Sequence, residues 1–228
     1  MVKIILFWAS SFLTLSFIVS PQAYAAPHPK NPVTFLGTPI TYSVGGSTVN
    51  IHPEANITLP TGEIVKVALS GKGTRQKWIA IVKVNAYVAI HYLDNPSLLS
   101  SQNPIDSLGK TQTRLMILHM LQNVSSEDIR AEFDDALDVN NVDLYSPEIS
   151  YIREQTTYSL NAGQRAFLIG YLTPEDNKEH ISIFTTEKTI EEKGTTLVSD
   201  LWRVWLGIPV DQEMLVLKKS LLSTAGKP

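Results

Sequence analysis

The sequence predicts an α+β protein in which helices pack on one face of an antiparallel sheet. Short extended segments fill the first half of the chain, a pair of helical segments follows, and strands and helices then alternate to the end. This grouping of strands before helices is typical of α+β folds. No internal repeat is visible, and about 200 residues are enough for one domain with its own core.

The first 25 residues have the three parts of a secretory signal peptide. Lys3 provides a basic start, an apolar stretch covers residues 4–19, and Ala23 and Ala25 are the small residues of a cleavage site. We therefore expect cleavage after Ala25 and a location in a bacterial periplasm, with secretion as the second choice. The alternative is a retained membrane anchor, but the stretch is short for a span and contains several Ser and Thr. No later segment of the sequence is long and apolar enough to span a bilayer.

Composition excludes several classes of function. The formal net charge is −3, and it becomes −4 when Lys3 is removed with the leader, so the chain has no basic face for nucleic acid. Cysteine is absent, so stability must come from the core and not from disulfides. The five histidines have no metal-ligand spacing. We expect neither a metal nor another cofactor.

The first elements are a lead-in and a hairpin. Residues 26–33 are proline-rich and are expected to be flexible, with one domain over residues 34–228. The segments ITYSV at 40–44 and STVNI at 47–51 flank Gly45-Gly46, a pattern that predicts a β-hairpin.

The next strands are EIVKVAL at 63–69 and a long apolar run over residues 78–93. Alternate side chains of a strand share a face. One parity of the run is almost wholly apolar and should be buried, whereas the other carries polar residues that include Asn85, Tyr87 and His91. That mixed face is either exposed to water or the floor of a cleft. A β-bulge within the run would change both faces.

The middle of the chain changes from strand to helix. The segment TRLMILHML at 113–121 predicts a buried strand, although its periodicity also allows a short helix. The helix predicted over residues 125–137 begins with a capping box, Ser125 with Asp128. A second helix is predicted over residues 146–160, with Ser146 as its N-cap.

The last third of the chain predicts two strands and two helices. The strands are AFLIGYL at 166–172 and HISIFTT at 180–186. The first helix covers residues 195–206 and ends at Gly207, a residue favoured at helix C-termini. The last helix begins at Asp211.

The segment GKGTR leads into the long apolar run and has the clearest chemical meaning. Arg75 lies twelve positions before Tyr87, so an unbroken strand would place both side chains on one face. A guanidinium binds a carboxylate through two parallel hydrogen bonds, and a tyrosine hydroxyl can add a third. Gly71 and Gly73 allow backbone or ligand to approach closely. The alternative is that Arg75 lies on a loop in water.

GKGTR with Tyr87 and AIHYL at 89–93 resembles the signature of the chalcone isomerase family. NVSSEDIRAEFDDAL and LWRVWLGIPVDQEMLVLKKSLL are similar to a helix and a C-terminal motif of its bacterial chalcone-isomerase-like branch. The resemblance covers most of residues 64–223. It implies an open-faced β-sandwich, a large antiparallel sheet covered by a layer of helices with a cleft between them.

The resemblance also implies ligand-binding residues. Arg75 falls at the catalytic arginine of the plant enzymes, and Tyr87 at a threonine that helps to arrange a water. Val204 and Trp205 fall at a pair of residues that contact the substrate, and Asn85 is a further candidate on the face of Tyr87.

The sequence departs from the plant enzymes on the helix that begins at Ser125. A catalytic tyrosine and asparagine are expected there, but acidic residues stand near both positions: Glu127 or Asp128, and Asp134 or Asp135. Carboxylates would repel a phenolate instead of stabilising it. In the fatty-acid-binding branch, the arginine and a strand tyrosine hold a carboxylate.

We therefore expect a non-catalytic exported protein that binds a small amphipathic carboxylate, such as a fatty acid. The first alternative is an isomerase or intramolecular lyase of the chalcone isomerase type that acts on an enone-like substrate. The second is a structural or interaction protein in which its own side chains, Trp205 above all, fill the cleft.

Overall fold

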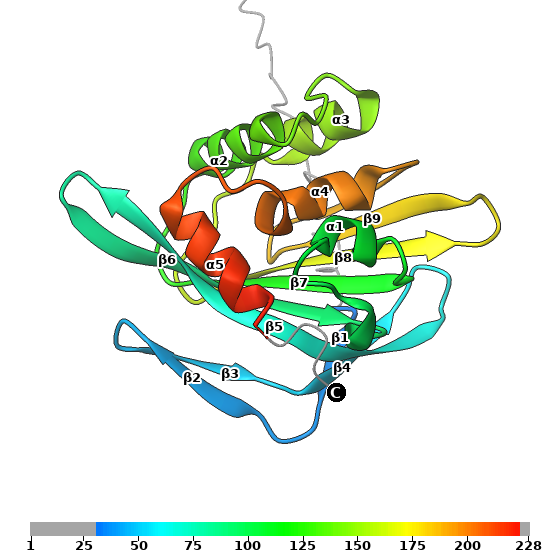
Figure 1. Ribbon diagram of the computed structural model, residues 1–228, viewed down its shortest axis with the longest axis horizontal. Coiled ribbons are helices and arrows are strands. Elements are labelled where there is room, and N and C mark those ends of the chain that lie inside the picture. The colour runs from blue at the N-terminus through cyan, green and yellow to red at the C-terminus, as the bar shows by residue number, and fades with distance from the viewer. Residues whose placement is uncertain (1–30, 224–228) are drawn as a thin grey trace, which may run out of the picture.

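The computed structural model describes residues 31–223 (Figure 1). The signal peptide expected over residues 1–25 lies outside the described residues, as does most of the lead-in expected over residues 26–33. The described chain is α+β, with a large curled antiparallel sheet and five α-helices. None of the helices described is both long and apolar enough to cross a membrane.

The sheet has eight strands in the order β1-β4-β5-β6-β7-β8-β9-β10, and every neighbouring pair is antiparallel. The strands are β1 Val33–Leu36, β4 Glu54–Thr58, β5 Ile64–Ile79, β6 Val82–Leu93, β7 Thr113–Met120, β8 Arg165–Thr173, β9 Lys178–Phe184 and β10 Thr189–Gly194. A separate hairpin consists of β2 Ile40–Val44 and β3 Ser47–Ile51. The hairpin expected around Gly45-Gly46 is thus confirmed.

The helices lie together on one face of the sheet, and the β2–β3 hairpin lies on the other (Figure 1). They are η1 Pro96–Leu98, α1 Pro104–Leu108, α2 Ser126–Val139, α3 Pro147–Gln155, α4 Leu197–Leu206 and α5 Gln212–Leu221. The expected helix starts are confirmed: the side chain of Ser125 accepts a hydrogen bond from the Asp128 backbone N–H, and that of Asp211 accepts one from Met214. The second helix of the middle pair is shorter than expected, because α3 ends at Gln155.

Each face of the sheet has its own apolar core. On the helical face, Tyr87, Ala89 and Leu93 pack with side chains from all five α-helices. On the opposite face, Val88 and Ile90 pack with side chains of the β2–β3 hairpin and of β1 and β4. The mixed face of β6 between residues 87 and 93 is therefore buried under helices, and the interpretation of this face as exposed to water was wrong.

The run over residues 78–93 is not one strand. β5 continues to Ile79, a two-residue turn at Ala80-Ile81 reverses the chain, and β6 begins at Val82. The apolar composition concealed this turn, because two-residue hairpin turns usually contain Gly, Asn or Asp.

Two bulges change the register between β5 and β6. The register shifts between the pairs Leu69–Tyr92 and Gly71–His91, where Ser70 is the extra residue. It shifts again between the pairs Arg75–Tyr87 and Gln76–Asn85, where Ala86 is the extra residue. Each extra residue reverses the alternation of faces beyond it. The positions of Arg75 and Tyr87 therefore follow from cross-strand pairing and not from a continuous strand.

Candidate ligand site between sheet and helices

The two glycines of GKGTR allow α5 to lie directly on β5. A Cβ atom at Gly71 would collide with the backbone carbonyl of Leu221, and one at Gly73 would lie 2.7 Å from the Cβ of Ser220. Helix α5 and strand β5 lie side by side along this stretch (Figure 1). The glycines thus provide a packing site for α5, and the close approach expected at them is made by the chain itself.

The side chain of Arg75 points inward and binds a carboxylate of its own chain. Its Nη1 and Nη2 atoms donate to Oδ1 and Oδ2 of Asp211, each at 2.7 Å. Only 3% of the Arg75 side chain is exposed, against 42% of the Asp211 side chain. Asp211 is also the N-cap of α5, so one carboxylate caps the helix and attaches it to the sheet. The alternative placement of Arg75 in water was wrong.

Asp211 is held ionised by this arrangement. Burial of the carboxyl raises its pKa, but the hydrogen bonds from Arg75 and from the Met214 backbone outweigh burial and lower the pKa below its ordinary value. The Nε atom of Arg75 is buried without a hydrogen-bond partner among the described residues. Arg75 therefore has one further N–H that can donate to a ligand.

Tyr87 lies beside Arg75 as its cross-strand partner. Its hydroxyl oxygen accepts a hydrogen bond from Nε1 of Trp205 at 3.2 Å. Among the hydrogen bonds of residues 31–223, this hydroxyl donates none. Burial raises the pKa of Tyr87, although the Trp205 hydrogen bond and the Arg75 charge oppose that change. Tyr87 is therefore a protonated phenol with a free O–H.

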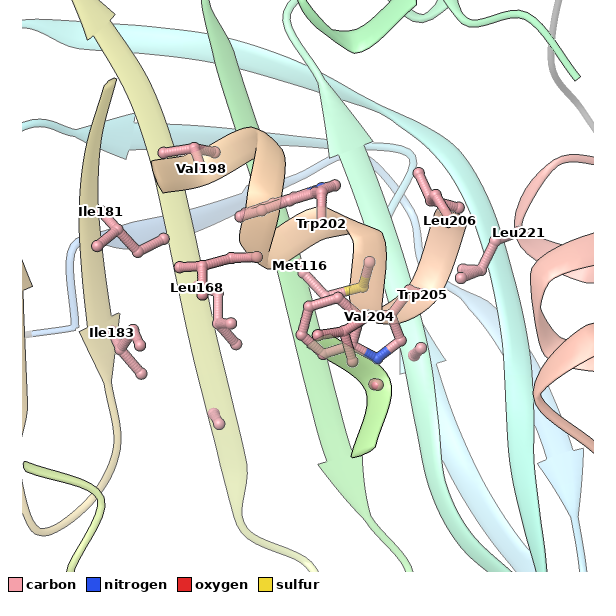
Figure 2. Packing of buried hydrophobic residues seen from close by; sticks show 14 of the residues in the cluster. Met116, Leu168, Ile181, Ile183, Val198, Trp202, Val204, Trp205, Leu206 and Leu221 are labelled. Atoms are coloured by element: carbon pink, nitrogen blue, oxygen red, sulfur yellow. The ribbon is translucent and has the colours of Figure 1, made fainter. Parts of the chain in front are cut away.

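Two adjoining apolar cavities lie between the sheet and the helices, and Tyr87 borders one of them. Their volumes are about 80 and 70 Å³. Both are lined by side chains of β7, α2 and α4 and by Leu160: Leu118, Ile129, Phe133, Leu160 and Trp205. The cavity nearer to Arg75 is also bordered by Tyr87, Val204 and Met214. Figure 2 shows α4 lying across the central strands, with Val204 and Trp205 near Met116 of β7.

The structure brings together three of the five candidate residues, Tyr87, Val204 and Trp205. Arg75 adjoins this group through Tyr87 but does not line either cavity. Asn85 is separate from it: its Oδ1 accepts from Nε2 of Gln76 at 2.9 Å, and its amide lies next to Gly45 of the β2–β3 hairpin. The bulge at Ala86 turns Asn85 toward the face opposite Tyr87, so its placement beside Tyr87 was wrong.

The acidic residues of α2 do not form a catalytic group in the cavities. Asp134 binds Arg153 through two hydrogen bonds of 2.6 and 2.7 Å, and Asp128 belongs to the capping box of the helix. Glu132 borders one cavity but forms an ion pair with Lys77 of β5. Asp134 and Glu132 thus attach α2 to α3 and β5, whereas Asp128 bonds within its own helix.

The sequence interpretation missed a buried polar group at His91. Nε2 of His91 accepts from Nε1 of Trp202 at 2.9 Å, so the ring proton is on Nδ1, which lies 2.8 Å from Oγ of Ser70. Oγ of Ser70 donates to the backbone carbonyl of His91 at 3.0 Å. Burial, together with the nearby positive charge of Arg114, lowers the pKa of His91 to about 3. His91 is therefore a neutral core residue that fastens α4 to the sheet.

A second buried polar group lies under the start of α4. Nη2 of Arg114 donates to Oε1 of Glu179 at 3.2 Å, and Glu179 also accepts from the backbone and hydroxyl of Ser199. The only signal in the sequence was that both charges lie within strand segments. Their pairing could not be read locally, because Arg114 and Glu179 lie 65 residues apart.

Comparison with protein-family models finds no match, and comparison with curated proteins finds no similar sequence. Within residues 31–223, no group of three or more His, Cys, Asp or Glu side chains is arranged to hold a metal ion. The site is therefore interpreted from its own geometry.

Proposed function

We propose that the protein is exported to a bacterial periplasm and binds a small amphipathic carboxylate, such as a fatty acid, without catalysing a reaction. The proposal includes the chalcone-isomerase-like open-faced β-sandwich, with which the helices on one face of the antiparallel sheet are compatible. One observation carries the proposal. One of two adjoining apolar cavities ends at a phenol with a free O–H, beside a buried guanidinium whose present partner is a half-exposed carboxylate.

The acyl chain would occupy the two cavities under α2. Their lining is almost wholly apolar, which suits hydrocarbon. They are small, so a longer chain needs α2 to move outward. This movement would expose only two buried side chains of α2, Ala136 and Leu137. It would also break the ion pairs of Asp134 with Arg153 and of Glu132 with Lys77.

The carboxylate would take the place of Asp211 on Arg75. Leaving a buried charge without a partner costs about 3–5 kcal/mol, so the guanidinium must always have a carboxylate. Asp211 can rotate toward solvent, because its side chain is half exposed, whereas Arg75 cannot. The incoming carboxylate would also accept a hydrogen bond from the free O–H of Tyr87. Asp211 thus acts as an internal competitor of the ligand.

A second candidate is a structural or interaction protein with a filled cleft. The two complete hydrogen bonds between Arg75 and Asp211 favour it, since they fasten α5 without any ligand. No observation favours an isomerase. The ionisable groups that line the cavities are two tyrosines, Tyr87 and Tyr158, one carboxylate, Glu132, and two arginines, Arg130 and Arg153. We expect no cyclisation of hydroxychalcones.

The two candidates predict different effects of Asp211→Asn. A ligand-binding protein gains affinity, whereas a structural pair only loses stability because Arg75 is left without its carboxylate. Asparagine caps a helix as well as aspartate does, so α5 should stay in place while the competing charge is lost. Dodecanoate should then bind about tenfold more tightly, because a larger fraction of the protein has a free guanidinium. Arg75→Gln should weaken binding at least tenfold. Displacement of a fluorescent fatty acid measures both effects.

Glu54→Gln is the matched control, because it removes the carboxylate of an exposed ion pair with Lys66 at the far side of the sheet. It should leave the affinity for dodecanoate unchanged. Native mass spectrometry of wild-type protein purified from the exporting cell should show a bound lipid that Arg75→Gln lacks. Absence of measurable affinity in wild type and in Asp211→Asn would refute ligand binding and favour the structural candidate.

A further inference from the structure

The turn between β5 and β6 exposes a continuous group of apolar side chains, here named the hairpin tip and defined as residues 78–82. The exposed fractions are 57% for Trp78, 62% for Ile79, 89% for Ile81 and 58% for Val82. The β5–β6 hairpin extends past the end of α5 to one side of the molecule (Figure 1). More than half of each of these side chains is therefore exposed.

The residues of the tip are also poor turn formers. Ala80 has a φ of +54°, a left-handed conformation that glycine, asparagine and aspartate adopt more easily than alanine. Ile81, which is the most exposed large apolar residue described, is β-branched and favours extended strands. Neither residue stabilises the turn and neither is buried, so their apolar surface points to a contact outside the chain.

Charged and polar groups are arranged behind the tip. Lys77 pairs with Glu132, and Lys83 pairs with Glu213 at 2.9 Å. Nε1 of Trp78 donates to the same Glu213 at 3.0 Å, so the indole ring has its polar edge toward the body of the protein. Tryptophan with its N–H at a polar boundary, flanked by lysines, is the arrangement found where proteins meet the headgroup region of a bilayer.

From these observations we propose that the hairpin tip inserts into the surface of a lipid bilayer. The shape of the tip favours lipid over a protein partner. The tip consists of two strands only about 5 Å apart, so its surface is too narrow for the roughly 800 Å² that each partner of a stable protein interface provides. A lipid bilayer is fluid, so its lipids can contact the narrow hairpin tip on all sides. Because the flanking lysines are already paired, apolar contact and not anionic lipid should provide most of the affinity.

This inference does not depend on the proposed ligand, since the tip is separate from both cavities. It is tested by flotation of the protein purified from the exporting cell with phosphatidylcholine vesicles, with and without phosphatidylglycerol. Ile81→Asn should reduce the fraction bound to vesicles roughly tenfold, because it removes the most exposed apolar side chain of the tip. Anionic lipid should change binding of the wild type less than twofold.

Ile64→Asn is the matched control. Ile64 is 65% exposed and begins the same strand, β5, at the end opposite the tip. This variant should bind vesicles as the wild type does. Trp78 provides a second measurement: lipid brominated near the headgroups should quench its fluorescence, and Trp78→Phe should abolish that part of the quenching.

Equal flotation of wild type and Ile81→Asn, or no quenching of Trp78, would overturn the proposal. Sedimentation separates the protein alternative. If the wild type is an oligomer without lipid and Ile81→Asn makes it monomeric, the tip is an interface between copies of the chain and not a membrane contact. Circular dichroism should show that both variants are folded.

Discussion

At the scale of single residues, the buried imidazole of His91 makes the stability of the protein depend on pH. It is wholly buried, and both ring nitrogens are used in hydrogen bonds with Trp202 and Ser70. Protonation would break the bond from Trp202, whose N–H can only donate. The ring must therefore be neutral in the folded protein, whereas it is free to bind a proton in the unfolded chain.

The sign of the pH effect follows from this difference. The pKa of His91 is about 3 in the folded state and about 6.5 in an unfolded chain, so the unfolded state binds more protons between these values. The stability that neutral His91 provides is complete above pH 6.5 and is lost as pH falls toward 3. Between pH 7 and 4.5 the loss from this residue should be about 2–3 kcal/mol.

Denaturant unfolding of wild type and His91→Gln at the two pH values checks this prediction. Glutamine can accept from Trp202 but does not titrate, and every other ionisable group is retained. The variant should be less stable at pH 7, and its further loss at pH 4.5 should be smaller than that of the wild type. The same acid loss in both proteins would show that His91 does not control it.

The residues of the candidate site show how far the position and partners of a single side chain can be predicted from the sequence. The sequence allowed an inward Arg75 beside Tyr87 as one of two alternatives, and the two residues are cross-strand partners. The spacing of twelve within an unbroken strand was the wrong reason, because a turn separates them. The carboxylate on that arginine was expected from a ligand, but Asp211 supplies it from 136 residues away. Nothing local distinguishes an aspartate that only caps a helix from one that also binds a strand arginine, so long-range pairing could not be predicted.

At the scale of elements, the contact between β5 and α5 depends on a missing side chain. A Cβ at Gly71 would meet the backbone of Leu221, which cannot move aside as a flexible side chain can. Gly71→Ala should therefore push α5 away from the sheet and destabilise the protein by about 1–3 kcal/mol. Weaker attachment of α5 should also weaken the pairing of Arg75 with Asp211.

Thermal or urea unfolding measures this loss, and Gly109→Ala provides the control. Gly109 has a φ of −58°, and an added Cβ would be 3.5 Å from its nearest atom. Alanine fits there without strain, so stability should change by no more than about 0.5 kcal/mol. If Gly71→Ala is equally harmless, the glycine does not set the distance between helix and strand.

The elements that the sequence predicted are those with strong local patterns. Capping residues and helical periodicity marked α2, α4 and α5, and alternation with glycines marked the β2–β3 hairpin. The turn at Ala80-Ile81 and the bulges at Ser70 and Ala86 carried no such pattern, because they depend on pairing with another strand. The face of Asn85 was wrong for this reason.

At the scale of the whole molecule, the two faces of the sheet explain where stability is concentrated. Strand β7 is buried from Thr113 to Ile117, between the helices on one face and the hairpin core on the other. The sequence predicted a layer of helices and the burial of the apolar residues Val88, Ile90 and Tyr92, but not the hairpin and first strands that cover them. That core forms because the curled sheet brings the first strands over the face opposite the helices, and this curvature is not a local property.

Helix α2 is much less buried than strand β7, and this difference in burial leads to a last prediction. It buries only Ala136 and Leu137 and covers two cavities, so it should open at a lower free energy than the central strands. Hydrogen exchange measured by mass spectrometry should show faster exchange in residues 126–139 than in residues 113–120. Saturating dodecanoate should slow exchange in α2 by filling the cavities, and should do so more strongly in Asp211→Asn. Equal protection of helix and strand would mean that α2 does not open separately, and the ligand would then have no entrance beneath it.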